Sequence, residues 1–410
     1  MANSSIEIRQ DLNLSDIVDY GDSHLSRVIQ YLDLYINIVF VFVASVFALG
    51  TNIANMLVLI KQGVRGCVSL CLFSISATDF LSTLTGFISV MFKILMHLYK
   101  QPGFNPAAVF FLLVYASAVL YDVSNTLTAF LSLERCLCVT LPFKFKDIFT
   151  TKLTAVVIVC VYMLCFGLMM PHFLSSGLRM KTFENSTYLT LWLSSDRIAV
   201  DTYIDVKNFC QISVILGIVL VCTSLMIISL NISSKFHNKD TTTTAKPLKS
   251  SKTRPEVNFK VSSSMPTPEI TNHEGKGKIE TKRKNKKNPT KNKDTIKDPQ
   301  SNGPLTKENT ARKQEKNTQS SRNLNVIKTV VMLCVICFVC NLSRIIASTA
   351  IVLEPRLKIG REYYDWYQLM IAVCYVFQLF NCSLNIFVYY NYNQSFRETL
   401  RQLLGCKSNT

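Results

Sequence analysis

An acid–base pair, Glu134 and Arg135, stands at the end of a long apolar run that covers residues 107–133. This run is about 27 residues long, more than the roughly 20 that a helix needs to cross a bilayer. The pair is therefore expected where the helix leaves the lipid, and Pro142 follows to end the helix. A basic side chain at such a boundary often only extends toward lipid headgroups, whereas one held by an acidic neighbour can be a functional element.

Two further charges, Asp122 and Arg344, lie inside apolar runs. An unpaired charge there costs at least a few kcal/mol, so something must compensate each of them. The two side chains pair with each other, or Arg344 faces a cavity and receives an anionic group, or a span boundary is misplaced and one of them reaches the headgroups. Ser117 and Tyr121 are four residues apart, so they share a helix face that could line a ligand pocket.

The elements that must position these residues are seven apolar runs in a chain that is 49% hydrophobic. Each run is long enough to span a membrane as a helix, and none alternates as a barrel strand would. We therefore predict an all-α membrane protein, a seven-transmembrane helix bundle with a short amphipathic eighth helix at 394–404. The expected spans are 35–60, 67–92, 107–133, 154–173, 209–230, 326–353 and 367–390.

The distribution of charge predicts the orientation of the bundle. Between Lys235 and Arg322 there are 22 Lys and Arg against 9 Asp and Glu, which is +13 of the total net charge of +17. The short flanking loops decide the orientation: basic residues such as Lys61, Arg65 and Lys152 all fall on one side, which is then cytoplasmic. The N-terminus is therefore expected outside and the C-terminus inside, in the plasma membrane. The basic segment is expected to be disordered and to contact anionic lipid, and it gives no positive case for nucleic acid.

Several small motifs fit this orientation. The N-terminal tail is polar and acidic, so the first span should act as its own insertion signal, and Cys406 is a candidate for palmitoylation. The 14 cysteines lie in apolar runs or beside the inner edge, so we expect no outer disulfide and no metal site formed by them. N-glycosylation sequons on the outer side begin at Asn3, Asn13 and Asn185.

The resulting organisation has five parts. They are an extracellular tail (1–34), transmembrane helices 1–5 (35–232), a basic third cytoplasmic loop (233–324), transmembrane helices 6–7 (325–391), and an amphipathic helix with a cytoplasmic tail (392–410).

Motifs in four of the spans resemble those of rhodopsin-like (class A) G-protein-coupled receptors. Glu134-Arg135-Cys136 is similar to the family's Asp/Glu-Arg-Tyr, and Asn55-Met56-Leu57-Val58 to its Asn-x-x-Val. Asp79 stands in a stretch like that around the family's intramembrane Asp. The run from Asn381 to Tyr389 resembles the Asn-Pro-x-x-Tyr region, with Ile386 in place of the proline.

The resemblance implies roles for these residues. Glu134 would hold Arg135 at rest, and activation would free Arg135 to contact a heterotrimeric G protein, with Asn385 and Tyr389 taking part. A polar core would include Asn55 and a possible sodium-binding cluster, and the alternative is a hydrogen-bond network that only joins helices. The residues at the sodium positions are Asp79, Ser124, Asn381 and Asn385.

Departures from the family pattern are equally informative. Asn341 and Ser343 replace the Trp and Pro of the sixth span, which removes the usual toggle and kink, and Ser117 stands where amine receptors carry an Asp. Asn341 is therefore added to the candidate ligand pocket of Ser117, Tyr121, Asp122 and Arg344. The motifs look most like those of gastropod mollusc chemosensory-type receptors, near invertebrate neuropeptide receptors, which implies a peptide or a chemosensory cue as ligand.

Two other functions stay open. A transporter or channel also buries charges, although the chain has neither the inverted repeats nor the broken helices typical of transporters. A non-signalling decoy receptor is compatible with the missing Trp and Pro. No enzyme motif is found, so we expect no catalysis and no cofactor other than an allosteric sodium ion.

Overall fold

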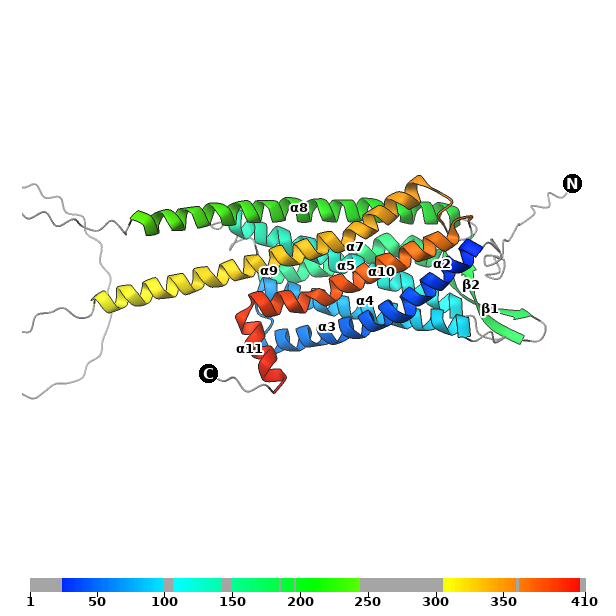
Figure 1. Cartoon of the computed structure of the whole chain (residues 1–410), viewed down its shortest axis with the longest axis horizontal. Coiled ribbons are helices and arrows are strands. Elements are labelled where there is room, and N and C mark those ends of the chain that lie inside the picture. Colours follow the sequence, from blue (N-terminus) through cyan, green and yellow to red (C-terminus); the bar gives the residue numbers. More distant parts are fainter. Residues whose placement is uncertain are drawn as a thin grey trace, which may run out of the picture. The chain divides into compact units, whose positions relative to one another are not determined.

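The computed structural model describes residues 24–98, 106–141, 149–183, 186–194, 197–243, 305–358 and 361–405. Long helices make up most of the described chain, with one β-hairpin between α7 and α8 (Figure 1). The elements are α2 (His24–Tyr35), η1 (Ile36–Val41), α3 (Phe42–Gln62), α4 (Cys67–Leu98), α5 (Pro106–Thr140), α7 (Thr151–Leu174), β1 (Ser176–Phe183), β2 (Ser186–Leu193), α8 (Arg197–Thr243), α9 (Leu305–Leu353), α10 (Tyr364–Tyr392) and α11 (Gln394–Leu403).

Seven helical stretches of the described chain are long and apolar enough to cross a membrane, which confirms the predicted seven-transmembrane bundle. Helix α4 packs between α3 and α5, while α10 packs against α2 and α3, and α7 packs against α4 and α5. The spans are Leu25–Gln62, Cys67–Leu95, Val109–Thr140, Thr151–Leu174, Ala199–Ser229, Leu324–Leu353 and Tyr364–Tyr392.

The bundle has apolar side chains outside and polar ones inside. Val159 and Met163 on α7 expose more than half of their surface, whereas Asn52, Asn55 and Ser76 are completely buried. A water-soluble bundle would have the opposite arrangement, because apolar surface is normally removed from water. The exposed apolar surface is therefore the surface that faces lipid.

The first span begins earlier than the sequence predicted. The tail was expected to reach residue 34, but α2 starts at His24 and continues through the π-helical segment η1 into α3. Asp33, which marked the boundary in the sequence, is buried and forms an ion pair of 2.5 Å with Lys93 on α4. The helix takes in a charged residue because a partner on the neighbouring helix neutralises it.

The fifth span also begins earlier, and this correction changes the site. We expected it at 209–230, yet α8 starts at Arg197. Asp205 pairs with Lys358 at 2.6 Å, and Lys207 lies within the bundle. A hydropathy profile excludes such charged residues from a predicted span because it takes no account of the residues on other helices that neutralise them.

The segment 233–324, which we predicted to be disordered, is helical at both of its ends. Helix α8 continues to Thr243, and α9 begins at Leu305, while residues 244–304 lie outside the described chain. Extending an existing helix is far easier than nucleating one, and the Lys, Glu, Gln and Arg of 305–324 are good helix formers. Residues 237–316 form a unit separate from the bundle.

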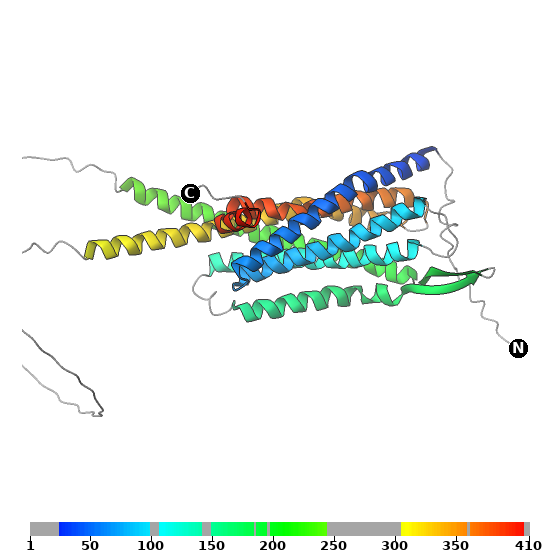
Figure 2. The ribbon, with the colours of Figure 1, turned by 90° about the horizontal axis from the view of Figure 1, so that it is seen from below.

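The β-hairpin and α11 lie at opposite ends of the bundle, as Figures 1 and 2 both show. The two antiparallel strands, β1 and β2, are an addition to the predicted all-α fold, and Gly177 is paired with Trp192. Helix α11 has the predicted amphipathic character: the Asn393 side chain caps its start by accepting from the Phe396 amide, and Phe396 and Leu400 are buried. Four residues predicted to be modified lie outside the described residues: Asn3, Asn13, Asn185 and Cys406.

Candidate functional site

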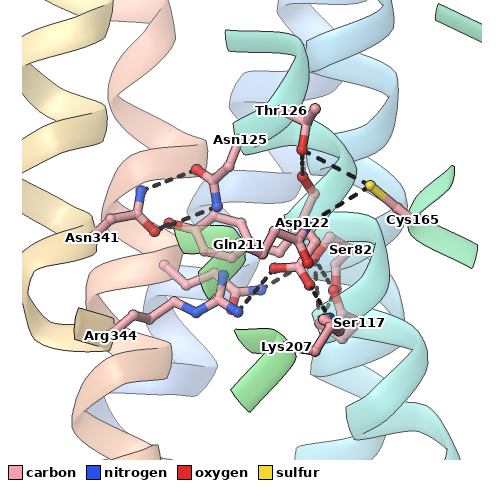
Figure 3. A network of polar contacts seen from close by, with 12 residues as sticks. Ser82, Ser117, Asp122, Asn125, Thr126, Cys165, Lys207, Gln211, Asn341 and Arg344 are labelled. Atoms are coloured by element: carbon pink, nitrogen blue, oxygen red, sulfur yellow. Dashed lines mark hydrogen bonds and ion pairs between the residues drawn. The ribbon is translucent and has the colours of Figure 1, made fainter. Parts of the chain in front are cut away.

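Three charged side chains from three helices meet inside the bundle (Figure 3). Asp122 on α5 accepts from Lys207 on α8 at 3.0 Å and from Arg344 on α9 at 2.9 Å, each cation contacting a different carboxylate oxygen. Lys207, Asp122 and Arg344 expose only 6%, 8% and 17% of their side chains. This charged cluster (Asp122, Lys207, Arg344) is the pairing of Asp122 with Arg344 that the sequence left open, with a second cation added.

A layer of amide side chains lies next to the charged cluster. Asn341 on α9 donates to the Oδ1 atom of Asn125 on α5 at 3.0 Å, and Asn381 on α10 donates to the same atom at 3.5 Å. The Tyr121 hydroxyl donates to Oδ1 of Asn341 at 3.2 Å, and the Arg344 guanidinium lies 5.2 Å from the centre of the Tyr121 ring. This amide layer (Asn125, Asn341, Asn381) joins three helices.

The intramembrane Asp79 forms a separate carboxylate cluster with Ser124, Cys382 and Asn385. The Ser124 hydroxyl donates to Oδ1 of Asp79 at 2.5 Å, the Asn385 amide donates to Oδ2 at 3.0 Å, and the Cys382 thiol contacts Oδ1 at 3.4 Å. These partners are all uncharged. The sequence placed Ser124 and Asn385 correctly beside Asp79, whereas Asn381 bonds to the amide layer.

Asn55 is completely buried, as expected for a polar-core residue, but it makes no hydrogen bond to Asp79. Neither its amide nitrogen nor its amide oxygen has a partner within the described residues. It is Asn52, one turn earlier, that links the first and seventh spans by donating to the carbonyl of Cys382 at 3.1 Å. A buried amide without a protein partner is a position where ordered water is commonly found.

The carboxylate cluster has the chemistry to hold a sodium ion. A hard cation prefers oxygen ligands, and Asp79 supplies a carboxylate that no basic side chain neutralises in the contacts described above. The Ser124 hydroxyl can rotate to present its oxygen, and the Asn385 amide carries one as well. Asp79, Ser124 and Asn385 would hold the ion, and it would supply the missing positive charge.

The acid–base pair lies near the opposite end of α5. Arg135 donates to Oε1 of its neighbour Glu134 at 2.6 Å; the Glu134 side chain is fully buried, and that of Arg135 is 15% exposed. Tyr389 on α10 is buried one turn after Asn385, and its ring packs edge-on against Phe396 of α11 at 5.4 Å. The sequence-predicted coupling residues thus lie toward the end of the bundle that carries α11.

A cavity of about 270 Å³ opens beside the charged cluster. Asp122, Arg344 and Ser117 line it, so three of the five predicted pocket residues are on its wall. Ser117 on α5 donates a hydrogen bond to the carbonyl of Ser82 on α4. Tyr121 and Asn341 are instead wholly buried and bonded to each other.

The family profile described as 7 transmembrane receptor (rhodopsin family) matches residues 51–389, which is most of the chain. The chain belongs to the rhodopsin family of seven-transmembrane receptors. The profile covers all three clusters and the acid–base pair, and members of this family are receptors rather than enzymes. No curated protein matches the receptor in a sequence comparison.

Sequence reasoning missed two residues of the receptor that the structure makes central, Lys207 and Asn125. Lys207 stood two residues before the predicted fifth span, and the signal that could have found it was the unexplained charge of Asp122. Asn125 follows Ser124, and in the sequence it is one more uncharged polar residue in an apolar run. A helix face can be read from spacing, but the partner across the bundle cannot.

Proposed function

We propose that the receptor binds an extracellular ligand in the cavity and in response activates a heterotrimeric G protein at the other end of the bundle. The observation that carries this proposal is the buried Glu134–Arg135 ion pair, 2.6 Å long, on the same helix as the cavity-lining Asp122. Glu134 restrains Arg135 in the resting arrangement. Ligand binding shifts the population toward an arrangement in which Arg135 is released to the G protein.

Nucleotide exchange on a purified G protein, with the full-length receptor in nanodiscs, tests the coupling. Glu134→Gln removes the restraint and should raise basal exchange severalfold, whereas Arg135→Ala should bring it to the level without receptor. Arg356→Ala is the matched control, because Arg356 is an exposed arginine outside the spans. Exchange that is unaffected by Arg135→Ala would refute the coupling role, and no exchange from Glu134→Gln would favour a non-signalling receptor.

The ligand is proposed to be a peptide or a chemosensory cue, as the resemblance to gastropod mollusc chemosensory-type receptors implies. Ser117, which is buried and bonded to Ser82, offers no charge to an amine. The carboxylate cluster is proposed to bind sodium as an allosteric ion. Sodium binding by this cluster is compatible with a hydrogen-bond network that also joins the helices.

The receptor is proposed to lie in the plasma membrane with its N-terminus outside. This follows from the short loops and span ends on the opposite side, where basic residues such as Lys61, Arg65 and Lys152 favour the cytoplasm. Epitope tags at the N-terminus and near residue 270, stained in intact and in permeabilised cells, test it. Surface staining of the tag near 270 would overturn the orientation.

A further inference from the structure

The charged cluster carries one positive charge in excess. Asp122 forms ion pairs with both Lys207 and Arg344, and within the described part of the chain it is the acidic residue that pairs with these two cations. All three side chains are largely buried. A buried charge without a counter-ion is unfavourable by several kcal/mol, so the cluster has a strong tendency to acquire an anion.

Arg344 is the member of the cluster that can receive that anion. Its Nη2 atom contacts Asp122 at 2.9 Å, while its Nη1 atom is buried and has no hydrogen-bond partner among the described residues. Arg344 also lines the cavity, with Tyr121 under its guanidinium plane. A planar guanidinium with one nitrogen committed and the other open can bind a second carboxylate through its open edge.

The rest of the cavity wall offers no second surplus cation. Lys93 pairs with Asp33 at 2.5 Å, and Lys358 pairs with Asp205 at 2.6 Å. The remaining wall carries one further acidic residue, Asp201, and is otherwise rich in aromatic and aliphatic side chains, among them Phe111, Ile351 and Tyr367. One anionic group at Arg344 and an apolar body along this wall are the features that the cavity complements.

We propose that the cavity binds a ligand with a single carboxylate and an apolar or aromatic body, and that Arg344 binds the carboxylate beside Asp122 and Lys207. This rests on the proposed function, because it takes the cavity as the ligand site of the receptor. The carboxylate can belong to a free organic acid or to the C-terminus of a short peptide. The two sources share their recognition chemistry at Arg344.

The test is thermal unfolding of the purified full-length receptor in nanodiscs with matched pairs of probes. The acids are 3-phenylpropionate, octanoate and the N-acetylated dipeptide N-acetyl-glycyl-phenylalanine, and the neutral partners are the two methyl esters and the amide of the same N-acetylated dipeptide. At least one acid should raise the Tm by a few degrees, and its neutral partner should not. A shift with the dipeptide alone identifies a peptide C-terminus, and a shift with a simple acid identifies a free acid.

Substitutions then assign the effect to the cluster. Arg344→Gln should abolish the acid-dependent shift, and Lys207→Gln, which leaves a neutral Asp122–Arg344 pair, should weaken acid binding at least about tenfold. Arg356→Gln, outside the cavity, should leave the shift intact. If Arg344→Gln does not fold, Lys207→Gln alone decides.

Two results would overturn the proposal: no acid stabilises the receptor more than its neutral partner does, or the shift persists at full size in both cluster variants. Nucleotide exchange separates this from a failure of coupling. An acid that binds through Arg344 without stimulating exchange supports the ligand site and contradicts coupling. Exchange that is stimulated equally by the acids and the neutral probes supports coupling and contradicts the ligand site.

Discussion

The charged cluster and the carboxylate cluster stabilise a buried aspartate in opposite ways. Asp122 is held by two cations, whereas Asp79 is held by the uncharged side chains of Ser124, Asn385 and Cys382. The first arrangement leaves an excess positive charge, and the second gives the carboxylate no cationic partner among the contacts described. The difference teaches that one bundle can bury the same residue type with cationic partners in one cluster and with uncharged partners in another.

Removing the carboxylate from the charged cluster should have the largest effect. Asp122→Asn leaves Lys207 and Arg344 as buried like charges without a counter-ion, which should cost about 3–5 kcal/mol and abolish surface expression. Flow cytometry of a tagged receptor measures it. The triple variant Asp122→Asn, Lys207→Gln, Arg344→Gln should recover part of the expression, and Asp205→Asn, at a more exposed pair, should cost little.

If Asp122→Asn alone reaches the surface at the normal level, the two cations are solvated and the contrast between the clusters fails. If the surface expression of the triple variant does not exceed that of Asp122→Asn, the three residues are needed for packing rather than for charge balance.

Filling the cavity should have an intermediate effect. A Cβ atom added at Gly86 would clash with the Tyr375 hydroxyl and lie 2.9 Å from Oγ of Ser117, so Gly86→Ala must displace part of the cavity wall. Overpacking of this kind costs about 1–3 kcal/mol, and thermal unfolding measures it. Among the described residues, no side chain or neighbouring element lies within 4 Å of a Cβ atom added at Gly167, so Gly167→Ala is the matched control. Equal stability of the two variants would mean that the wall yields freely.

Replacing the aspartate of the carboxylate cluster by asparagine should destabilise the receptor less than the same replacement in the charged cluster. Asp79→Asn keeps an acceptor for Ser124 and removes a charge that has no cationic partner in this cluster, so the cost should be about 1 kcal/mol or less. The same variant should lose any rise in Tm that sodium chloride gives over choline chloride. A loss of expression as large as that of Asp122→Asn would erase the distinction.

The smallest effect is expected at an ion pair outside the spans. Glu354 accepts from the side chain and the backbone of Arg356, which holds the pKa of the Glu354 carboxyl below its usual range. Its stabilisation is present above the unfolded pKa and is lost as the pH falls through the lowered folded pKa. Because both groups are solvent-exposed, Arg356→Gln should leave the Tm at neutral pH unchanged within error. A clear fall would show that exposed pairs in this receptor matter as much as buried ones.

The sequence was sufficient for the bundle because each span is defined by its own length and composition. It was also sufficient for Ser124 and Asn385 beside Asp79, because the family motif carries their spacing. It was insufficient for Lys207 and Asn125, whose roles depend on the partner that approaches from another helix. Asn381 shows the same limit: the resemblance placed it beside Asp79 at a sodium position, but the atom it contacts belongs to the amide layer.

The amide layer has a consequence for how this receptor can evolve. Aliphatic residues in a core can often be exchanged with small losses, because only volume and shape must match. Amides that share an acceptor must also match donor to acceptor, and losing one leaves a buried polar group unsatisfied, at about 1–3 kcal/mol. Substitutions in the amide layer should therefore be coupled during evolution. A change at one of its three positions, Asn125, Asn341 and Asn381, which are far apart in the sequence, should be accompanied by changes at the others.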